Sequence, residues 1–243
     1  MSVRRFTSAS SEKITLSVGN LGFAFGPGTI AAVVFPTQVT VAAHVFTAGS
    51  VTSATYALRM SAAGKVTLVC NTTTPAAPAG LPAMTANAWF LIAATKATGT
   101  VAPRYHHYVY STKTWTHIDS AATAANSGTP GTRAAFGTDN SGAAAFWQGD
   151  IAAAGVWNVV LTDAQIEALV LFSPAIPKGL WRLNQDSTGE NVLDLTGGGA
   201  DQSAIVGTSI TNVVQPVGMM NMAPPKPVPS SPRPVAVTRS TVW

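Results

Sequence analysis

The chain has 243 residues, of which 47% are hydrophobic and only 10% are charged. No run reaches the roughly 18 to 20 strongly apolar residues that a membrane-spanning helix needs, so membrane insertion is not expected. The single cysteine, Cys70, excludes an internal disulfide and is expected in the core. Of the net charge of +4, residues 1–222 carry +1 and residues 223–243 carry +3. A nearly neutral body with a basic tail argues against specific nucleic-acid binding.

The first twelve residues are predicted to form a polar, poorly ordered N-terminal arm. They have no apolar stretch after their two arginines, so no signal peptide is expected. Short apolar or alternating runs then recur every 8 to 12 residues between turn signals, which is typical of an all-β, two-sheet antiparallel sandwich. The expected strands are 13–25 (with a hairpin turn), 28–35, 39–46, 54–60, 66–70, 89–95, 105–110, 115–118, 133–137 and 151–160.

One short helix is predicted at about residues 162–171. Thr162 and Gln165 have the spacing of a capping box, in which each side chain accepts a hydrogen bond from the backbone N–H of the other residue. Leu161 and Ile166 flank the cap at the spacing of a hydrophobic staple. The sequence therefore specifies this helix locally.

The stretch around this helix resembles the end of a laminin-G-like (concanavalin A-like) jelly-roll domain. That family often has Asp where this chain has Ala152, so a polar or metal-related role of that Asp is not expected here. The resemblance implies a jelly-roll sandwich and rests on Trp147, Gly149, Ile151, Val156, Trp157, Asn158, Leu161, Thr162, Asp163 and Ile166.

A later segment, residues 180–208, resembles the beginning of the same kind of domain. Two interpretations stay open: a circular permutation, in which residues 180–214 supply the opening strands of one sandwich spanning 13–215, or a separate small β appendage. The matching residues are Trp181, Leu183, Asp194, Thr196, Gly197, Ile205, Val206, Gly207 and Thr208.

Residues 216–243 are predicted to form an extended, proline-rich C-terminal arm. Its prolines exclude helix and central strand, and favour polyproline-like backbone. Two interpretations stay open: a disordered tail, or an assembly arm that adds a strand or an aromatic anchor to a neighbouring subunit. The residues that would carry the second are Pro224, Pro225, Pro227, Arg233 and Trp243.

The candidate carbohydrate-binding surface is the segment 105–117, because aromatic rings stack on sugars and Tyr and Trp add a polar group. The alternative is that one face of this segment belongs to the core and the other is a plain strand surface or a subunit interface. The candidates are Tyr105, Tyr108, Tyr110, Trp115 and His117.

No resident cofactor or metal is predicted, with calcium as a weak exception. Oxygen ligands for Ca²⁺ are available from Asp139, Asn140 and Asp201. His106 and His107 are neighbours on a strand, point to opposite faces and cannot bind one ion together. No two acids alternate on a strand, as the paired carboxylates of a glycoside hydrolase would, so no enzymatic activity is expected.

The sequence also resembles laminin-G-like proteins of bacteriophage particles. This resemblance implies a non-enzymatic structural protein of the virion, made in the host cytoplasm, that is either a capsid decoration protein or a minor tail protein. The implied partners are other virion proteins, further copies of the same chain and, through exposed loops, host surface glycans. The first alternative is a free, lectin-like carbohydrate-binding module, and the second is a glycoside hydrolase.

Overall fold

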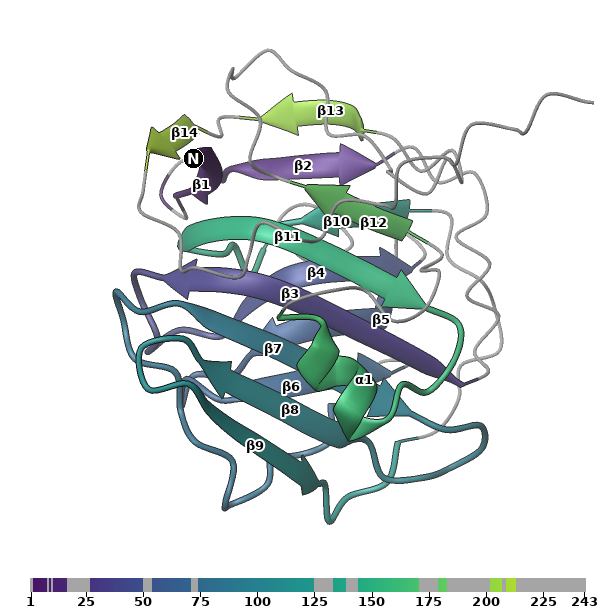
Figure 1. The fold of residues 1–243 in the computed structure, drawn as a ribbon. Helices are drawn as coiled ribbons and strands as arrows, with labels where there is room; N and C mark the ends of the chain where they lie inside the picture. Colours follow the sequence, from purple (N-terminus) through teal and green to yellow (C-terminus); the bar gives the residue numbers. More distant parts are fainter. Residues whose placement is uncertain are drawn as a thin grey trace, which may run out of the picture.

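The computed structural model describes residues 2–7, 9, 11–16, 27–49, 54–70, 74–124, 133–138, 144–170, 179–182, 202–206 and 209–212. Two twisted antiparallel sheets lie face to face, and one short helix lies against the outside of the larger sheet (Figure 1). The predicted all-β, two-sheet sandwich is thus confirmed. No helix in these ranges is long and apolar enough to cross a membrane.

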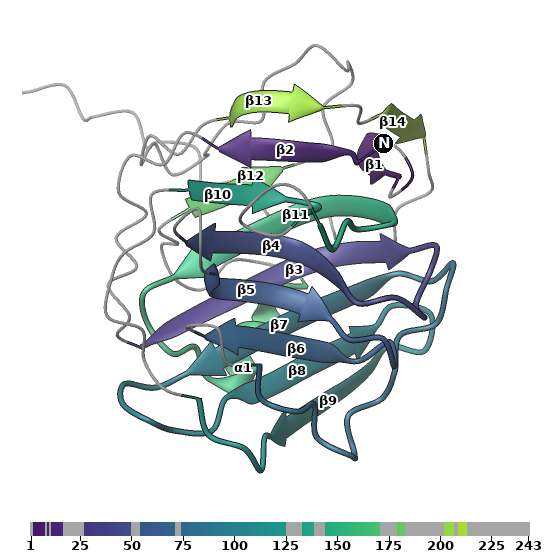
Figure 2. The same cartoon turned by 180° about the vertical axis from the view of Figure 1, so that it is seen from behind.

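The larger sheet has eight strands and the smaller has six. The larger runs in the order β14 (Ser209–Asn212), β1 (Ser2–Phe6), β11 (Gly149–Trp157), β3 (Gly28–Pro36), β7 (Phe90–Lys96), β8 (Arg104–Val109), β9 (Thr114–Asp119), with β12 (Gly179–Arg182) also paired to β11. The smaller runs β13 (Gln202–Val206), β2 (Lys13–Leu16), β10 (Arg133–Phe136), β4 (Ala43–Gly49), β5 (Ala54–Met60), β6 (Val66–Cys70), and Figure 2 shows it from behind.

The main core lies between the two sheets. Alternate residues of each strand enter it, because successive side chains of a strand point to opposite faces. On β3, Ile30, Ala32 and Val34 face this core, while Ala31 and Val33 belong to a second apolar cluster on the outer face. Such an uninterrupted apolar run is what a strand buried on both faces requires.

The outer cluster is completed by α1 (Asp163–Ala168) and the segment that leads into it. The predicted capping box is present: Gln165 N–H donates to Thr162 Oγ1 at 3.3 Å and Thr162 N–H donates to Gln165 Oε1 at 2.9 Å. Leu161 and Ile166, the predicted staple pair, are both buried in the outer cluster. Thr29 on β3 ties this segment to the sheet, since its hydroxyl donates to Val159 O and accepts from Leu161 N–H.

The N-terminal arm predicted for residues 1–12 is wrong, because residues 2–6 form strand β1 between β11 and β14. Phe6 is 1% exposed and provides an apolar anchor. Arg5 donates from Nε and Nη2 to the two oxygens of Asp150, at 2.7 and 2.8 Å, and Asp150 is fully buried. This pair fixes the strand in register, because without Arg5 the Asp150 carboxylate would be a buried charge with no cationic partner.

The strands of the C-terminal segment extend the sheets. β12 and β14 pair in the larger sheet, with β11 and β1, and β13 pairs with β2 at the edge of the smaller sheet. That they replace the opening strands of a permuted jelly roll stays a prediction. Residues 213–243 lie outside the described ranges, so the proline-rich arm at 216–243 also stays a prediction.

Ending the chain after Ala175 removes β12, β13 and β14 and should lower the free energy of unfolding substantially. The reason is that β1, β2 and β11 each lose a hydrogen-bonded neighbour. Urea unfolding followed by circular dichroism would measure the loss, with a chain ending after residue 215 as the control. A shortened chain as stable as this control would contradict the prediction that 180–214 belongs to the sandwich.

Candidate functional site

Two polar surfaces stand out, one on the outer face of each sheet. The first is on the hairpin of β8 and β9 beside α1. Cross-strand register pairs Arg104 with Asp119, His106 with His117, and Tyr108 with Trp115. Because alternate residues share a face, these six side chains lie together on the outer face of the larger sheet.

The predicted aromatic surface is divided by the sheet. Tyr105 is fully buried in the core between the sheets, where its hydroxyl accepts a hydrogen bond from Leu68 N–H at 3.3 Å. Burial raises its pKa to about 12. From this position the ring cannot stack on a sugar, so Tyr105 is not part of a surface site.

The other four predicted residues do come together. Tyr108 packs against Tyr110 with ring centroids 4.9 Å apart and against Trp115 at 4.7 Å, and both tyrosines are 8% exposed. Trp115 stacks on His117 at 5.2 Å with an interplanar angle of 14°. Both of these rings are partly exposed. A sugar-binding role for the four stays a prediction, with Trp115 and His117 as the accessible members.

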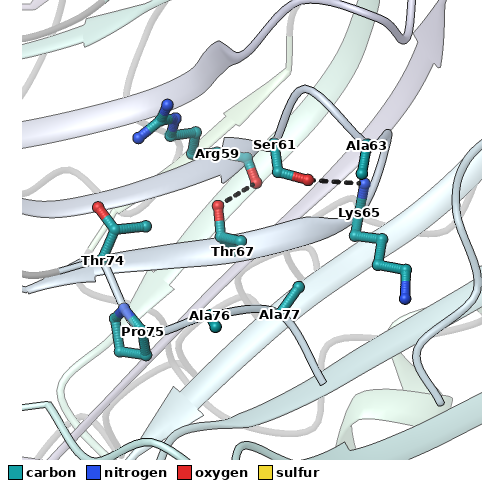
Figure 3. Close-up of a pocket in the computed structure, with 9 residues that line it drawn as sticks. All are labelled: Arg59, Ser61, Ala63, Lys65, Thr67, Thr74, Pro75, Ala76 and Ala77. Atoms are coloured by element: carbon teal, nitrogen blue, oxygen red, sulfur yellow. Dashed lines mark hydrogen bonds between the residues drawn. The ribbon is translucent and has the colours of Figure 1, made fainter. Parts of the chain in front are cut away.

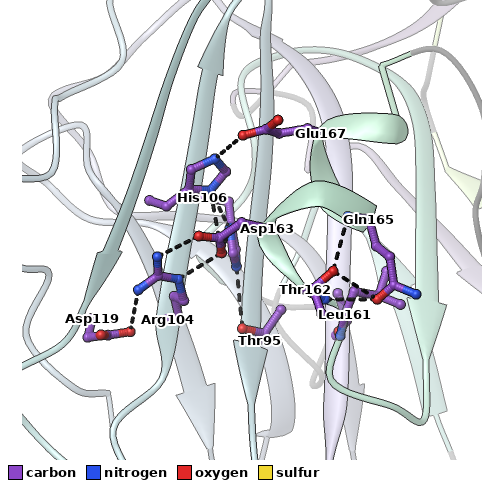
Figure 4. A network of polar contacts seen from close by, with 11 residues as sticks. Thr95, Arg104, His106, Asp119, Leu161, Thr162, Asp163, Gln165 and Glu167 are labelled. Carbon is purple, nitrogen blue, oxygen red and sulfur yellow. Dashed lines mark hydrogen bonds and ion pairs between the residues drawn. The ribbon is translucent and has the colours of Figure 1, made fainter.

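Beside the aromatic rings, Arg104 bridges two carboxylates (Figure 4). Its Nε and Nη2 donate to the two oxygens of Asp163 at 2.8 and 2.6 Å, and its Nη1 donates to Asp119 at 3.0 Å. The Arg104 hydrogen bonds hold the pKa of Asp163 below its usual value. Asp163 opens α1, so this pair also docks the helix on the sheet.

A chain of hydrogen bonds runs through the two histidines. His106 Nδ1 lies 2.8 Å from His117 Nδ1, His106 Nε2 lies 3.3 Å from Thr95 Oγ1, and His117 Nε2 lies 2.9 Å from Glu167 Oε1. The Glu167 carboxylate can only accept, so His117 carries its proton on Nε2. With both rings neutral, His106 Nδ1–H then donates to His117 Nδ1. Burial and the neighbouring His117 lower the pKa of His106 to about 4.

The expected opposite orientation of His106 and His107 is confirmed. His107 faces the core and packs against Phe90 with ring centroids 5.1 Å apart. Neither of its ring nitrogens has a hydrogen-bond partner among the described residues. Burial lowers its pKa to about 4.

The second polar surface is a hollow of about 390 Å³ on the smaller sheet (Figure 3). We call it the groove. Arg59 on β5 and Thr67 on β6 line it from the strands, and the loop after β6 closes its other side. Its lining residues are Arg59, Ser61, Ala63, Lys65, Thr67, Thr74, Pro75, Ala76 and Ala77.

The groove is rich in hydrogen-bonding groups. Lys65 Nζ donates to the carbonyls of Pro78 and Ala79 at 3.3 and 2.9 Å and so holds the loop in place. Arg59 Nε is buried and has no hydrogen-bond partner within the described part of the chain. Since buried donors are normally paired, this guanidinium is suited to an acceptor on a ligand.

Neither the groove nor the Arg104–Asp163 pair was predicted from the sequence. Alternation in β5 and β6 could have put Arg59 and Thr67 on one outer face, but the loop that completes the groove gives no sequence signal of where it folds. The calcium candidates Asp139, Asn140 and Asp201 lie outside the described residues, so that prediction stays untested.

The fold and the two polar outer faces define a lectin-like β-sandwich. The family model described as the concanavalin A-like lectin/glucanases superfamily matches residues 8–167, and the chain belongs to this family. The match ends before residue 180, so the C-terminal segment with its own laminin-G-like resemblance lies outside it. A comparison with curated proteins found no match.

Two solved structures illustrate the shared fold. The "putative carbohydrate binding protein" of Bacteroides ovatus is 16% identical, with a TM-score of 0.59 over 90% of this chain and 61% of that one. This chain therefore spans less than two thirds of that protein. The CBM40 of the Ruminococcus gnavus IT-sialidase is 17% identical, with a TM-score of 0.51 over 69% of this chain and 97% of that one. At these identities the likeness establishes the fold alone.

Replacing His107 with Leu should flatten the dependence of stability on pH. The pKa of His107 is about 4 in the folded chain and about 6.5 in an unfolded one. Between these values the unfolded chain binds more protons, so stability is lost as the pH falls from about 6.5 to about 4. The free energy of unfolding, measured by urea at pH 7 and pH 4, should fall by about 3 kcal/mol less in the variant.

Stability at pH 7 should change little, because Leu is close in size and the ring has no hydrogen bond to a described residue that could be lost. An identical pH dependence in the wild type and the variant would mean that His107 is not a buried neutral imidazole.

Proposed function

We propose that the protein is a non-enzymatic, lectin-like carbohydrate-binding module and that the groove on β5 and β6 takes an acidic saccharide. The observation that carries this proposal is that Arg59 lines the hollow and that its buried Nε has no hydrogen-bond partner within the described chain. A carboxylate or phosphate on a sugar would supply the missing acceptor, in a charge-assisted hydrogen bond.

The rest of the lining has the chemistry that such a ligand needs. Ser61, Thr67 and Thr74 offer hydroxyls that both donate and accept, as sugar hydroxyls do. Arg59 and Lys65 are the charged members of the lining, and both are cationic. The described lining residues include no aromatic ring, so recognition by them would depend on hydrogen bonds and charge rather than on stacking.

The acids of the described chain have structural partners, which supports a binding role rather than hydrolysis. Asp150 is buried against Arg5, Asp119 and Asp163 share Arg104, and Glu167 binds His117. A glycoside hydrolase needs one carboxyl group free to protonate the leaving oxygen and a second to act as nucleophile or base. The names of the two solved neighbours, a carbohydrate binding protein and a CBM40, agree with a binding module.

Removing the Arg59 guanidinium should weaken binding of acidic oligosaccharides. We expect Arg59→Gln to lower the affinity about tenfold or more, because a charge-assisted hydrogen bond contributes about 1.5 to 3 kcal/mol. Calorimetric titration with carboxylated and neutral oligosaccharides would measure this. Lys113→Gln is the matched control, because it removes the same charge from the exposed turn between β8 and β9.

Loss of binding in Trp115→Ala with full binding in Arg59→Gln would move the site to the aromatic surface on β8 and β9. Binding of neutral and acidic sugars with equal affinity would contradict the role given to the guanidinium.

We further propose that this module is a structural protein of a bacteriophage particle, as a capsid decoration protein or a minor tail protein. Two features support this: the resemblance to laminin-G-like virion proteins, and the proline-rich sequence at 216–243, whose composition suits an extended arm. In this role the sandwich would dock on other virion proteins or further copies of itself, and the groove would face host glycans.

Deleting residues 216–243 should leave the sandwich folded and weaken its incorporation into particles. The arm would otherwise add backbone hydrogen bonds or an aromatic anchor, such as Trp243, to a neighbour. Quantifying the protein in purified particles, together with thermal unfolding of the free chain, would measure both effects. Normal incorporation without the arm would contradict its assembly role, and absence of the full-length protein from particles would contradict the virion proposal.

A further inference from the structure

Three potential metal ligands converge where α1 meets the β8–β9 hairpin. His106 Nδ1 and His117 Nδ1 are 2.8 Å apart, and Asp163 Oδ1 lies 3.7 Å from the first and 3.9 Å from the second. Tetrahedral Zn²⁺ with bonds of about 2.0 to 2.1 Å requires donor atoms about 3.3 Å apart. Each observed separation is within about 0.6 Å of that value, a difference that small side-chain rotations can remove.

Groups that would orient the two imidazoles are already in place. Histidine ligands of metals generally donate their other N–H to a carboxylate or another oxygen, which fixes the ring and raises its basicity. His117 Nε2 has Glu167 Oε1 at 2.9 Å, and His106 Nε2 has Thr95 Oγ1 at 3.3 Å. If the His106 proton moves from Nδ1 to Nε2, both Nδ1 lone pairs face the ion and both Nε2–H groups keep an acceptor.

The local charge also favours a cation. Among the described residues, and with neutral imidazoles, the carboxylates of Asp119, Asp163 and Glu167 face the guanidinium of Arg104, which leaves two net negative charges. Arg104 holds Asp163 by both oxygens, but each carboxylate oxygen has two lone-pair sites. Asp163 Oδ1 can therefore keep its bond to Arg104 Nε and still bind an ion.

From this arrangement we propose that His106, His117 and Asp163 form a binding site for a borderline divalent transition metal, with Zn²⁺ as the best match. Two imidazoles and one carboxylate suit Zn²⁺, whereas Ca²⁺ takes six to eight oxygen ligands. The chain supplies three ligands, which leaves a fourth position for water on the side where His117 and Asp163 reach the surface. Bound metal would clamp α1 to the edge hairpin.

This proposed site departs from the expectation of no metal site other than calcium, which stays untested. That expectation rested on His106 and His107, which do point to opposite faces, and overlooked the cross-strand partner His117. Within the described part of the chain, His106, His117 and Asp163 are the one group of three His, Cys, Asp or Glu side chains whose ligand atoms lie close enough together to share an ion.

The full-length protein should bind one Zn²⁺ per chain, and this binding should raise the melting temperature of the protein. Calorimetric titration would measure the affinity, and Co²⁺ as a spectroscopic substitute should give the visible absorption of a tetrahedral site. His117→Gln should abolish both signals. Glu167→Gln keeps all three ligands and should weaken Zn²⁺ binding about 10- to 100-fold.

His107→Leu is the matched control, because it removes the adjacent histidine from the opposite face of the same strand and should bind Zn²⁺ like the wild type. Ca²⁺ at the same concentration should not raise the melting temperature through this site. Failure of the wild type to bind Zn²⁺, or equal binding by the wild type and His117→Gln, would overturn the proposal. If His117→Gln does not fold, the same test rests on Glu167→Gln, whose unchanged affinity would overturn it.

Discussion

The central strands of the larger sheet, β3, β7 and β11, are buried on both faces, and the rest of the structure depends on this constraint. The inner face of this sheet packs against the smaller sheet, and its outer face is covered by Trp157, Leu161 and Ile166, which lead into and through α1. The close fit is visible at Gly155, where a Cβ atom would lie 2.5 Å from the ring of Trp157. A β-bulge between Ile151 and Ala153 places two successive alanines under this cover.

This cover also explains why polar groups are buried at the edge of the sheet. His106 would be exposed on a bare outer face, but α1 brings Asp163 and Glu167 over the β8–β9 hairpin, so that each imidazole meets a carboxylate or a hydroxyl. The helix is only six residues long and could not be stable alone, so its apolar contacts and its ion pair with Arg104 hold it. No helix of the described residues lies over β5 and β6 of the smaller sheet, and its outer face carries the groove.

Sequence patterns among neighbouring residues predicted individual strands and the helix cap correctly. The strands at 54–60 and 66–70 and the capping box at Thr162 agree with the structure because alternation, a turn glycine and a cap are properties of neighbouring residues. The strand expected at 39–46 begins at Ala43 instead, since alternation alone does not show where a neighbouring strand is available for pairing. Strand β1 was not predicted, and an arm was expected in its place, because β1 is specified by distant partners, above all Asp150. The candidate sites depend on register in the same way: alternation predicts which residues share a face, but only the pairing of β8 with β9 and the docking of α1 bring His106, His117 and Asp163 together.

The central claim is that α1, docked on the outer face, orders the two imidazoles of His106 and His117 into one hydrogen-bonded chain. Long-range ¹H–¹⁵N NMR of the imidazole nitrogens at neutral pH tests this most directly, because it reports which nitrogen of each ring carries the proton. The account predicts a fixed Nδ1–H form for His106 and a fixed Nε2–H form for His117, with neither ring averaging between tautomers. Two rings that exchange freely between both forms, as solvated imidazoles do, would contradict it.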